Sequence, residues 1–102
     1  MINALFQPHM PLVFSLFEKH RVKEAYLFGS VLTDRFDEKS DIDILVHFMD
    51  GLDPLEKGEL LWSLRFMLED DLSRPVDLLT EKSLKNPFFI EELNEKKQKI
   101  YG

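Results

Sequence analysis

The chain has 102 residues, a formal net charge of −6 and no cysteine. This length suits one compact unit, so we expect residues 1–102 to form a single domain. The negative charge argues against nucleic-acid binding, which concentrates Lys and Arg on one face of a protein. Without cysteine, disulfides, thiolate zinc sites and cysteine nucleophiles are excluded. The composition is compatible with a reducing cytosol, and we expect a cytoplasmic protein.

Neither a signal peptide nor a membrane span is expected. Residues 1–10 contain no basic region followed by a long apolar run, as a signal peptide would. No stretch of the sequence approaches the roughly 20 apolar residues that a helix needs to cross a bilayer. We therefore expect no membrane partner.

The first half of the chain predicts a helix, a strand, a short helix and a second strand. Apolar residues at helical spacing follow a proline, which predicts a helix over Pro11–His20. Val22–Phe28 is rich in strand-forming residues and ends at a glycine, which predicts a strand running into a turn. A short helix over Val31–Arg35, a polar loop and a strand over Asp41–Phe48 are expected to follow.

The second half contains two helices that begin with the same signal, a capping residue followed by proline. These helices are expected over Pro54–Leu72, after Asp53, and from Pro87 to about Lys97, after Asn86. Two further strands are predicted at Val76–Leu79 and Ile100–Tyr101, the latter at the sheet edge. The fold class is therefore α+β (mixed α/β), with helices packed against one small mixed β-sheet.

Two acidic residues, Asp41 and Asp43, lie on the second predicted strand with one residue between them. Alternate residues of a strand share a face, so these carboxylates are expected to project together. They repel each other and add nothing to strand stability. A hard cation such as Mg²⁺ removes that conflict, because it favours carboxylate oxygens and keeps waters or phosphates as further ligands. The alternative is that both lie on a solvated face of an edge strand.

Gly29 and Ser30 lie where the first strand passes into the short helix. A helix start presents free backbone N–H groups, which bind phosphate. Glycine lets a phosphate approach the backbone closely, and the serine hydroxyl adds a donor. The alternative is an ordinary tight turn in which Ser30 caps the helix.

Asp77 is a single acidic residue in the otherwise apolar strand Val76–Leu79. If this strand lies beside Asp41–Phe48, Asp77 brings a third carboxylate to the same cluster. The alternative is an Asp at a strand end, paired with Arg74.

Together these residues resemble the DNA polymerase β-type nucleotidyltransferase superfamily: Gly29-Ser30, ten intervening residues, Asp41-x-Asp43 and the later Asp77. The short length and the ending after Asn86 resemble the minimal nucleotidyltransferase (MNT) domains. The resemblance implies a nucleotidyltransferase fold in which the Gly-Ser pair holds the triphosphate and the three acids bind two Mg²⁺ ions. It also implies transfer of AMP, or another NMP, from ATP or another NTP to a hydroxyl, with pyrophosphate leaving.

The sequence departs from this pattern at Thr33 and Asp34, where many members have Arg-Gly. Thr33 lacks the positive charge, and Asp34 adds a negative charge near the expected phosphates. Arg35, one position later, or Lys39 in the loop can supply the missing charge. The departure therefore concerns nucleotide binding and leaves the three acids intact.

The resemblance also implies a partner, because MNT chains commonly pair with a helical HEPN protein (higher eukaryotes and prokaryotes nucleotide-binding). In such toxin–antitoxin pairs the MNT member is the antitoxin and can adenylylate a tyrosine of the toxin. The alternative is a catalytically weak or silent module that neutralises a HEPN-type partner by contact. Trp62 and Phe66 form a second apolar stripe on helix 54–72, which is either core or a subunit contact. This helix and helix 87–97 are thus candidate surfaces for homo- or hetero-oligomers.

Overall fold

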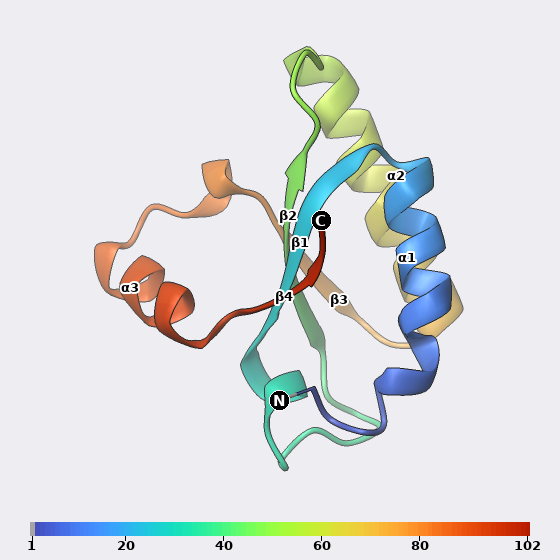
Figure 1. Ribbon diagram of the computed structural model, residues 1–102, viewed down its shortest axis with the longest axis vertical. Helices are drawn as coiled ribbons and strands as arrows, with labels where there is room; N and C mark the ends of the chain where they lie inside the picture. The colour runs from blue at the N-terminus through green and yellow to red at the C-terminus, as the bar shows by residue number, and fades with distance from the viewer. Residues whose placement is uncertain (1) are drawn as a thin grey trace.

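Four strands form one mixed sheet in the order β3-β2-β1-β4 (Figure 1). The structure, a computed structural model, describes residues 2–102. The central strand β1 (Val22–Phe28) pairs antiparallel with both β2 (Ile42–Phe48) and β4 (Gln98–Tyr101). The remaining strand, β3 (Val76–Leu79), pairs parallel with β2. This mixed sheet confirms the predicted fold class.

Helices cover the two faces of the sheet unequally (Figure 1). Helices α1 (Met10–Lys19) and α2 (Pro54–Leu72) lie together on one face, whereas α3 (Pro87–Lys96) lies on the other. Short 3₁₀ helices occupy three connections: η1 (Gln7–His9), η2 (Gly29–Leu32) and η3 (Glu81–Ser83). Among residues 2–102, no helix is long and apolar enough to cross a membrane.

The predicted helix starts at Asp53 and Asn86 are confirmed by their side-chain caps. The Asp53 carboxylate accepts a hydrogen bond from the Glu56 N–H at 2.9 Å, and the Asn86 side-chain oxygen accepts one from the Phe88 N–H at 2.9 Å. Each bond satisfies an N–H group that the first helical turn leaves without a partner. Proline follows both caps, and α2 has the predicted bounds.

The short helix predicted over Val31–Arg35 is wrong in position. The chain turns into η2 directly at Gly29 and leaves it after Leu32. The reason is local, because the Ser30 carbonyl accepts both the Thr33 N–H at 2.9 Å and the Thr33 hydroxyl at 2.8 Å. These bonds close a tight turn, and Thr33 itself is already extended. The last strand also begins earlier than predicted, at Gln98, where pairing with β1 starts.

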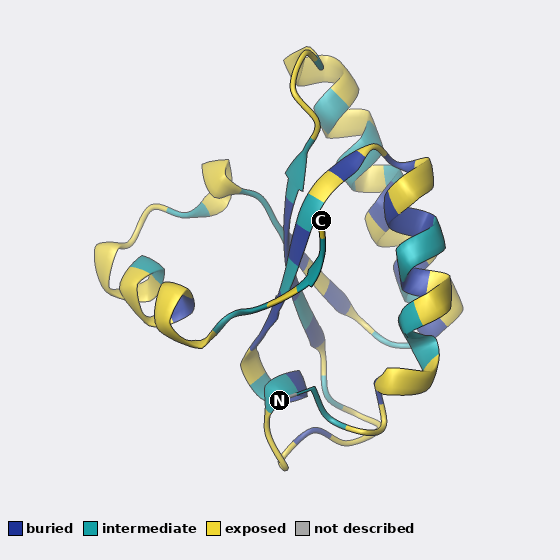
Figure 2. Cartoon of the chain, viewed as in Figure 1, coloured by how far each residue is buried: buried dark blue, intermediate teal, exposed yellow. Residues whose placement is uncertain are grey.

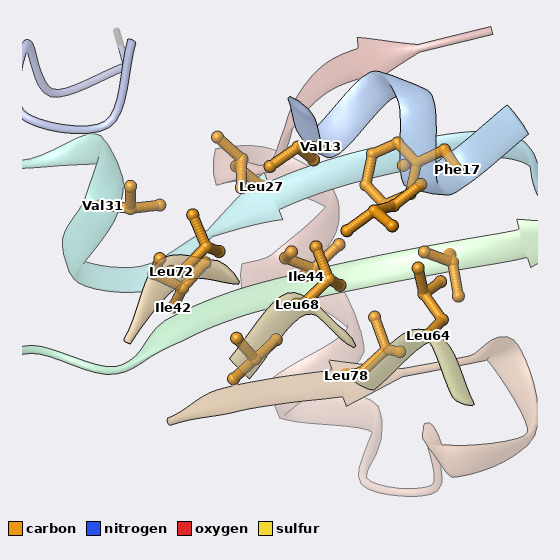
Figure 3. Packing of buried hydrophobic residues seen from close by; sticks show 14 of the residues in the cluster. Val13, Phe17, Leu27, Val31, Ile42, Ile44, Leu64, Leu68, Leu72 and Leu78 are labelled. Atoms are coloured by element: carbon orange, nitrogen blue, oxygen red, sulfur yellow. The ribbon is translucent and has the colours of Figure 1, made fainter. Parts of the chain in front are cut away.

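The main core lies between the sheet and the α1–α2 layer (Figure 3). Strand alternation sends one set of side chains into it, including Ile42, Ile44 and Val46 of β2. From α2, Leu64, Leu68 and Leu72 enter the same core. Residues at odd positions of β2 therefore face the opposite side of the sheet, toward α3.

Helix α3 is held by a much smaller cluster than α1 and α2 are. Its one buried residue, Leu93, packs with Phe28 and Leu45 from the sheet. Most of the helix surface is exposed (Figure 2). The second stripe of α2 is also outside the core, since Trp62 is 74% exposed and Phe66 is 62% exposed. The interpretation of that stripe as core is therefore wrong, and it stays a candidate contact surface.

Candidate active site

Asp43 and Asp77 are direct neighbours across the parallel β2–β3 pair. Because Ile42 and Ile44 point into the main core, Asp43 projects from the opposite face of the sheet. Val76 and Leu78 place Asp77 on that same face by the same alternation. The sequence alone does not show whether these two strands are neighbours, and the observed sheet order places them side by side.

Asp41 lies just before β2 and is exposed to solvent. Its charge nevertheless acts on Asp43, together with that of Asp77. Within the described residues 2–102, no three side chains of His, Asp or Glu lie close enough to form a ready-made metal centre. The site thus consists of Asp43 and Asp77 on two adjacent strands, with Asp41 beside them at the solvent-exposed end.

Gly29 follows β1 at the point where β1 pairs Phe28 with Asp43. Its φ of +76° lies in the left-handed region, which favours glycine. A Cβ atom at this position would also collide with Oδ2 of Asp43. Glycine is therefore needed both for the turn and for the close approach of the backbone to the carboxylate.

The backbone conformations of Gly29 and Gly58 predict opposite effects of alanine on stability. We expect Gly29→Ala to lower the free energy of unfolding by about 1–2 kcal/mol, because alanine is strained at positive φ. We expect Gly58→Ala, in α2, to raise it by up to about 1 kcal/mol, because alanine favours helix and a Cβ there meets nothing. Urea unfolding of both variants beside the parent chain measures the two changes. Equal effects at the two positions would contradict the requirement for glycine at position 29.

Asp43 and Asp77 face a cavity of about 620 Å³ between the sheet and α3, whereas Asp41 does not line it. Gly29, Thr33, Asp43 and Asp77 contribute from the sheet side. The other lining residues are Phe28, Leu32 and, from α3, Phe89, Glu92, Leu93 and Lys96. The cavity is large enough for a small ligand of nucleotide size. Phe28 and Phe89 add apolar surface to its lining.

Burial, followed by the charges of Asp77 and Asp41, raises the pKa of Asp43 to about 6. A half-buried carboxylate with two like-charged neighbours is destabilised in its ionised form. A divalent cation beside it would remove that destabilisation, and hard cations prefer carboxylate oxygens. The donor chemistry of Asp43, Asp77 and Asp41 therefore fits Mg²⁺, with the remaining ligands supplied by water or phosphate.

The raised pKa predicts a specific pH dependence of stability in metal-free buffer. The folded chain binds the Asp43 proton more tightly than the unfolded chain, so stability from this group is lost as pH rises from about 4 through 6. The full change would be worth roughly 3 kcal/mol, but solvent still reaches the side chain, and we expect roughly 1 kcal/mol. Chemical unfolding in EDTA should show Asp43→Asn matching the parent near pH 4 and exceeding it near pH 7. A difference that does not change with pH would contradict this.

Arg74 does not pair with Asp77, contrary to the structural alternative for that residue. Its guanidinium donates to the carbonyls of Asp37 at 2.8 Å and Ser40 at 3.0 Å, and it lies over the Phe36 ring. Arg74 thus fixes the loop that leads into β2. Among residues 2–102, the Asp77 carboxylate forms no ion pair.

The remaining predicted nucleotide-binding residues lie less close to the cavity. Ser30 contacts its own turn, and Arg35 and Lys39 are exposed, with none of these three side chains lining the cavity. The lining residues of α3, above all Phe89 and Lys96, are not among the residues predicted from the sequence. No signal in the sequence identifies them, because the path of the chain from β3 across the sheet brings α3 to the site.

These features are compatible with a nucleotidyltransferase, and the family comparison shows this class. The family model of the nucleotidyltransferase domain matches residues 13–100, so the chain belongs to this family. Within it, the chain is a minimal nucleotidyltransferase domain, an enzyme of the nucleotidyl-transferring class. A relative from Methanocaldococcus jannaschii, named as a candidate protein adenylyltransferase, is 40% identical over 78 residues, which are 76% of each chain.

Solved structures share this fold over almost the whole chain. A candidate minimal nucleotidyltransferase has 28% identity and a TM-score of 0.67, covering 96% of this chain and 95% of its own. A toxin–antitoxin crystal structure with AMP-PNP has 25% identity and a TM-score of 0.70, covering 91% and 73%. A tri-AMPylated HEPN toxin in complex with an MNT antitoxin, from Shewanella oneidensis, includes a chain with 24% identity and a TM-score of 0.65, covering 94% and 71%. This last likeness shows the fold.

Proposed function

We propose that this protein transfers AMP from ATP to a hydroxyl group of a HEPN-domain protein and acts as the antitoxin of that partner. The observation that carries the proposal is the Asp43–Asp77 pair, which faces a cavity of about 620 Å³ with Gly29 at its edge. The names of the relatives support protein adenylyl transfer, and the toxin–antitoxin structures support the kind of partner.

The proposed reaction assigns a different task to each wall of the cavity. Asp43 and Asp77, with Asp41 at the edge, would hold two Mg²⁺ ions. When bound, such ions stabilise the entering and leaving oxygens of a phosphoryl displacement. Gly29 lets the backbone approach the Asp43 carboxylate closely, since it has no Cβ, and the start of η2 would offer backbone N–H groups to a phosphate. Asp77 would help to orient the attacking hydroxyl.

The test is transfer of label from ATP to the partner. The chain is incubated with α-labelled ATP, Mg²⁺ and a HEPN-domain protein from the same organism, and modified residues are located by mass spectrometry. We expect AMP on a partner hydroxyl and none when EDTA replaces Mg²⁺. Absence of AMP on the partner, at any ratio of the two proteins, would overturn the proposal.

A second candidate is a silent binding module, which two observations favour. Thr33 brings no charge to the cavity and Asp34 adds an acid nearby, while Trp62 and Phe66 expose apolar surface suited to a protein contact. This candidate predicts that the native chain and Asp43→Asn reduce the toxicity of the partner equally, and that neither transfers AMP to it. The first proposal predicts that only the native chain modifies it. Measuring toxicity and adduct together separates the two.

A further inference from the structure

Lys96 is the only cationic side chain that lines the cavity, among the residues that the structure describes. It shares this space with three carboxylates, those of Asp43, Asp77 and Glu92. Thr33, which also lines the cavity, brings no charge. A nucleoside triphosphate adds several further negative charges, and among the described lining residues Lys96 is the one whose positive charge can attract them.

The position of Lys96 on α3 follows from helical geometry. Phe89, Leu93 and Lys96 lie at spacings of four and three residues, so they share one face of the helix. Leu93 fixes that face against the sheet, because it is 3% exposed and packs on Phe28 and Leu45. Lys96 is therefore directed to the cavity by the same contact that docks the helix.

The Lys96 ammonium has a partner that nucleotide can replace. Its Nζ lies 3.1 Å from Oε1 of Glu92, one turn earlier on α3, and both side chains are largely exposed. An exposed pair of this kind contributes little stability. Phosphate oxygens offer the same ammonium a stronger, charge-assisted hydrogen bond. Glu92 thus holds Lys96 at the cavity without preventing it from binding a more highly charged ligand.

The geometry assigns to Lys96 the binding of the nucleotide's phosphates, so that α3 closes the site from the side opposite the acids. This assignment rests on the proposed function. It names Lys96 as the residue that supplies the positive charge which Thr33 lacks. Arg35 and Lys39 are given no part in it, because neither lines the cavity.

Equilibrium binding of ATP, ADP and AMP in Mg²⁺ buffer tests the assignment. We expect Lys96→Met to weaken ATP binding about tenfold, with a smaller loss for ADP and the smallest for AMP. Lys96→Arg should restore most of the ATP affinity. Lys85→Met, which removes an exposed lysine outside the cavity, should bind all three as the parent does. A merely structural role would weaken the three ligands equally.

A second-site variant sharpens the test. Thr33→Arg in the Lys96→Met chain places a cation on the same cavity from the sheet side, and we expect it to recover ATP affinity. Equal ATP affinity of Lys96→Met and the parent would overturn the assignment and leave the proposed function standing. No ATP binding by the parent at millimolar concentration would instead overturn the proposed function, and the assignment with it.

Discussion

Replacing Asp43 by Asn is expected to lower AMP transfer on the order of a hundred- to a thousandfold, the usual effect of removing one electrostatic group from a reacting phosphate's surroundings. Asp43 is the most constrained of the three acids, because it lies between Gly29 and Asp77. Asparagine keeps the shape of the side chain but not its charge. The variant should therefore fold as the parent does and lose AMP transfer.

Thermal unfolding with and without Mg²⁺ gives an independent readout of the same site. A ligand that binds only the folded chain raises its stability according to its concentration and affinity. We expect Mg²⁺ and ATP together to raise the melting temperature of the parent and to have little effect on Asp43→Asn. Asp70→Asn, which removes an exposed acid of α2, is the matched control and should behave as the parent. Transfer by Asp43→Asn at the parental rate would contradict the site.

Replacing Leu93 by Ala is expected to release α3 from the sheet without unfolding the rest of the chain. Leu93 is the buried residue of α3, and its cluster contains only two other buried side chains, Phe28 and Leu45. Truncation of a buried leucine costs about 2–5 kcal/mol, and we expect about 2 here, because the site lies near solvent. The main core is on the other face of the sheet and keeps its contacts.

Hydrogen exchange measures this local effect. We expect amides of residues 90–96 to exchange about thirtyfold faster in Leu93→Ala, while those of β1, β2 and α2 stay protected. Leu64→Ala is the matched control, since Leu64 lies in the main core and its loss should accelerate exchange throughout the chain. ATP affinity should fall in Leu93→Ala, because α3 carries one wall of the cavity. Uniform acceleration in both variants would show that α3 is not a separate unit.

Local signals predicted most elements because those signals are also the physical causes of the elements. Asp53 and Pro54 start α2 by supplying a side-chain acceptor and a residue without an N–H, and both effects operate within one helical turn. The predicted position of the short helix after Gly29 is wrong, because its end depends on the hydrogen bond from the Thr33 hydroxyl to the Ser30 carbonyl. The sequence does not specify that bond. A histidine at a helix end is usually on the surface, yet His20 is buried, and its Nε2 lies 3.0 Å from Oγ of Ser63 in α2, 43 positions away.

The site was predictable on the sheet side and not on the helix side. Strand alternation fixes the face of Asp43 and of Asp77 from sequence alone, and only their adjacency needed the structure. Lys96 gave no such signal, because lysine near a helix C-terminus is also what the helix dipole favours. Its role depends on where α3 lies, which is set by contacts of Leu93 with distant strands.

The two ends of the α3 segment are attached to opposite edges of the sheet, β3 before it and β4 after it (Figure 1). When α3 leaves the sheet, it therefore stays tethered at both ends and remains at high effective concentration. After such an opening, α3 would therefore close on the sheet again without a diffusional search; in the proposed function, the opening would admit a nucleotide or release pyrophosphate. Cutting the chain between β3 and α3 would remove this property, and would also free β4 to leave β1 with an unpaired edge.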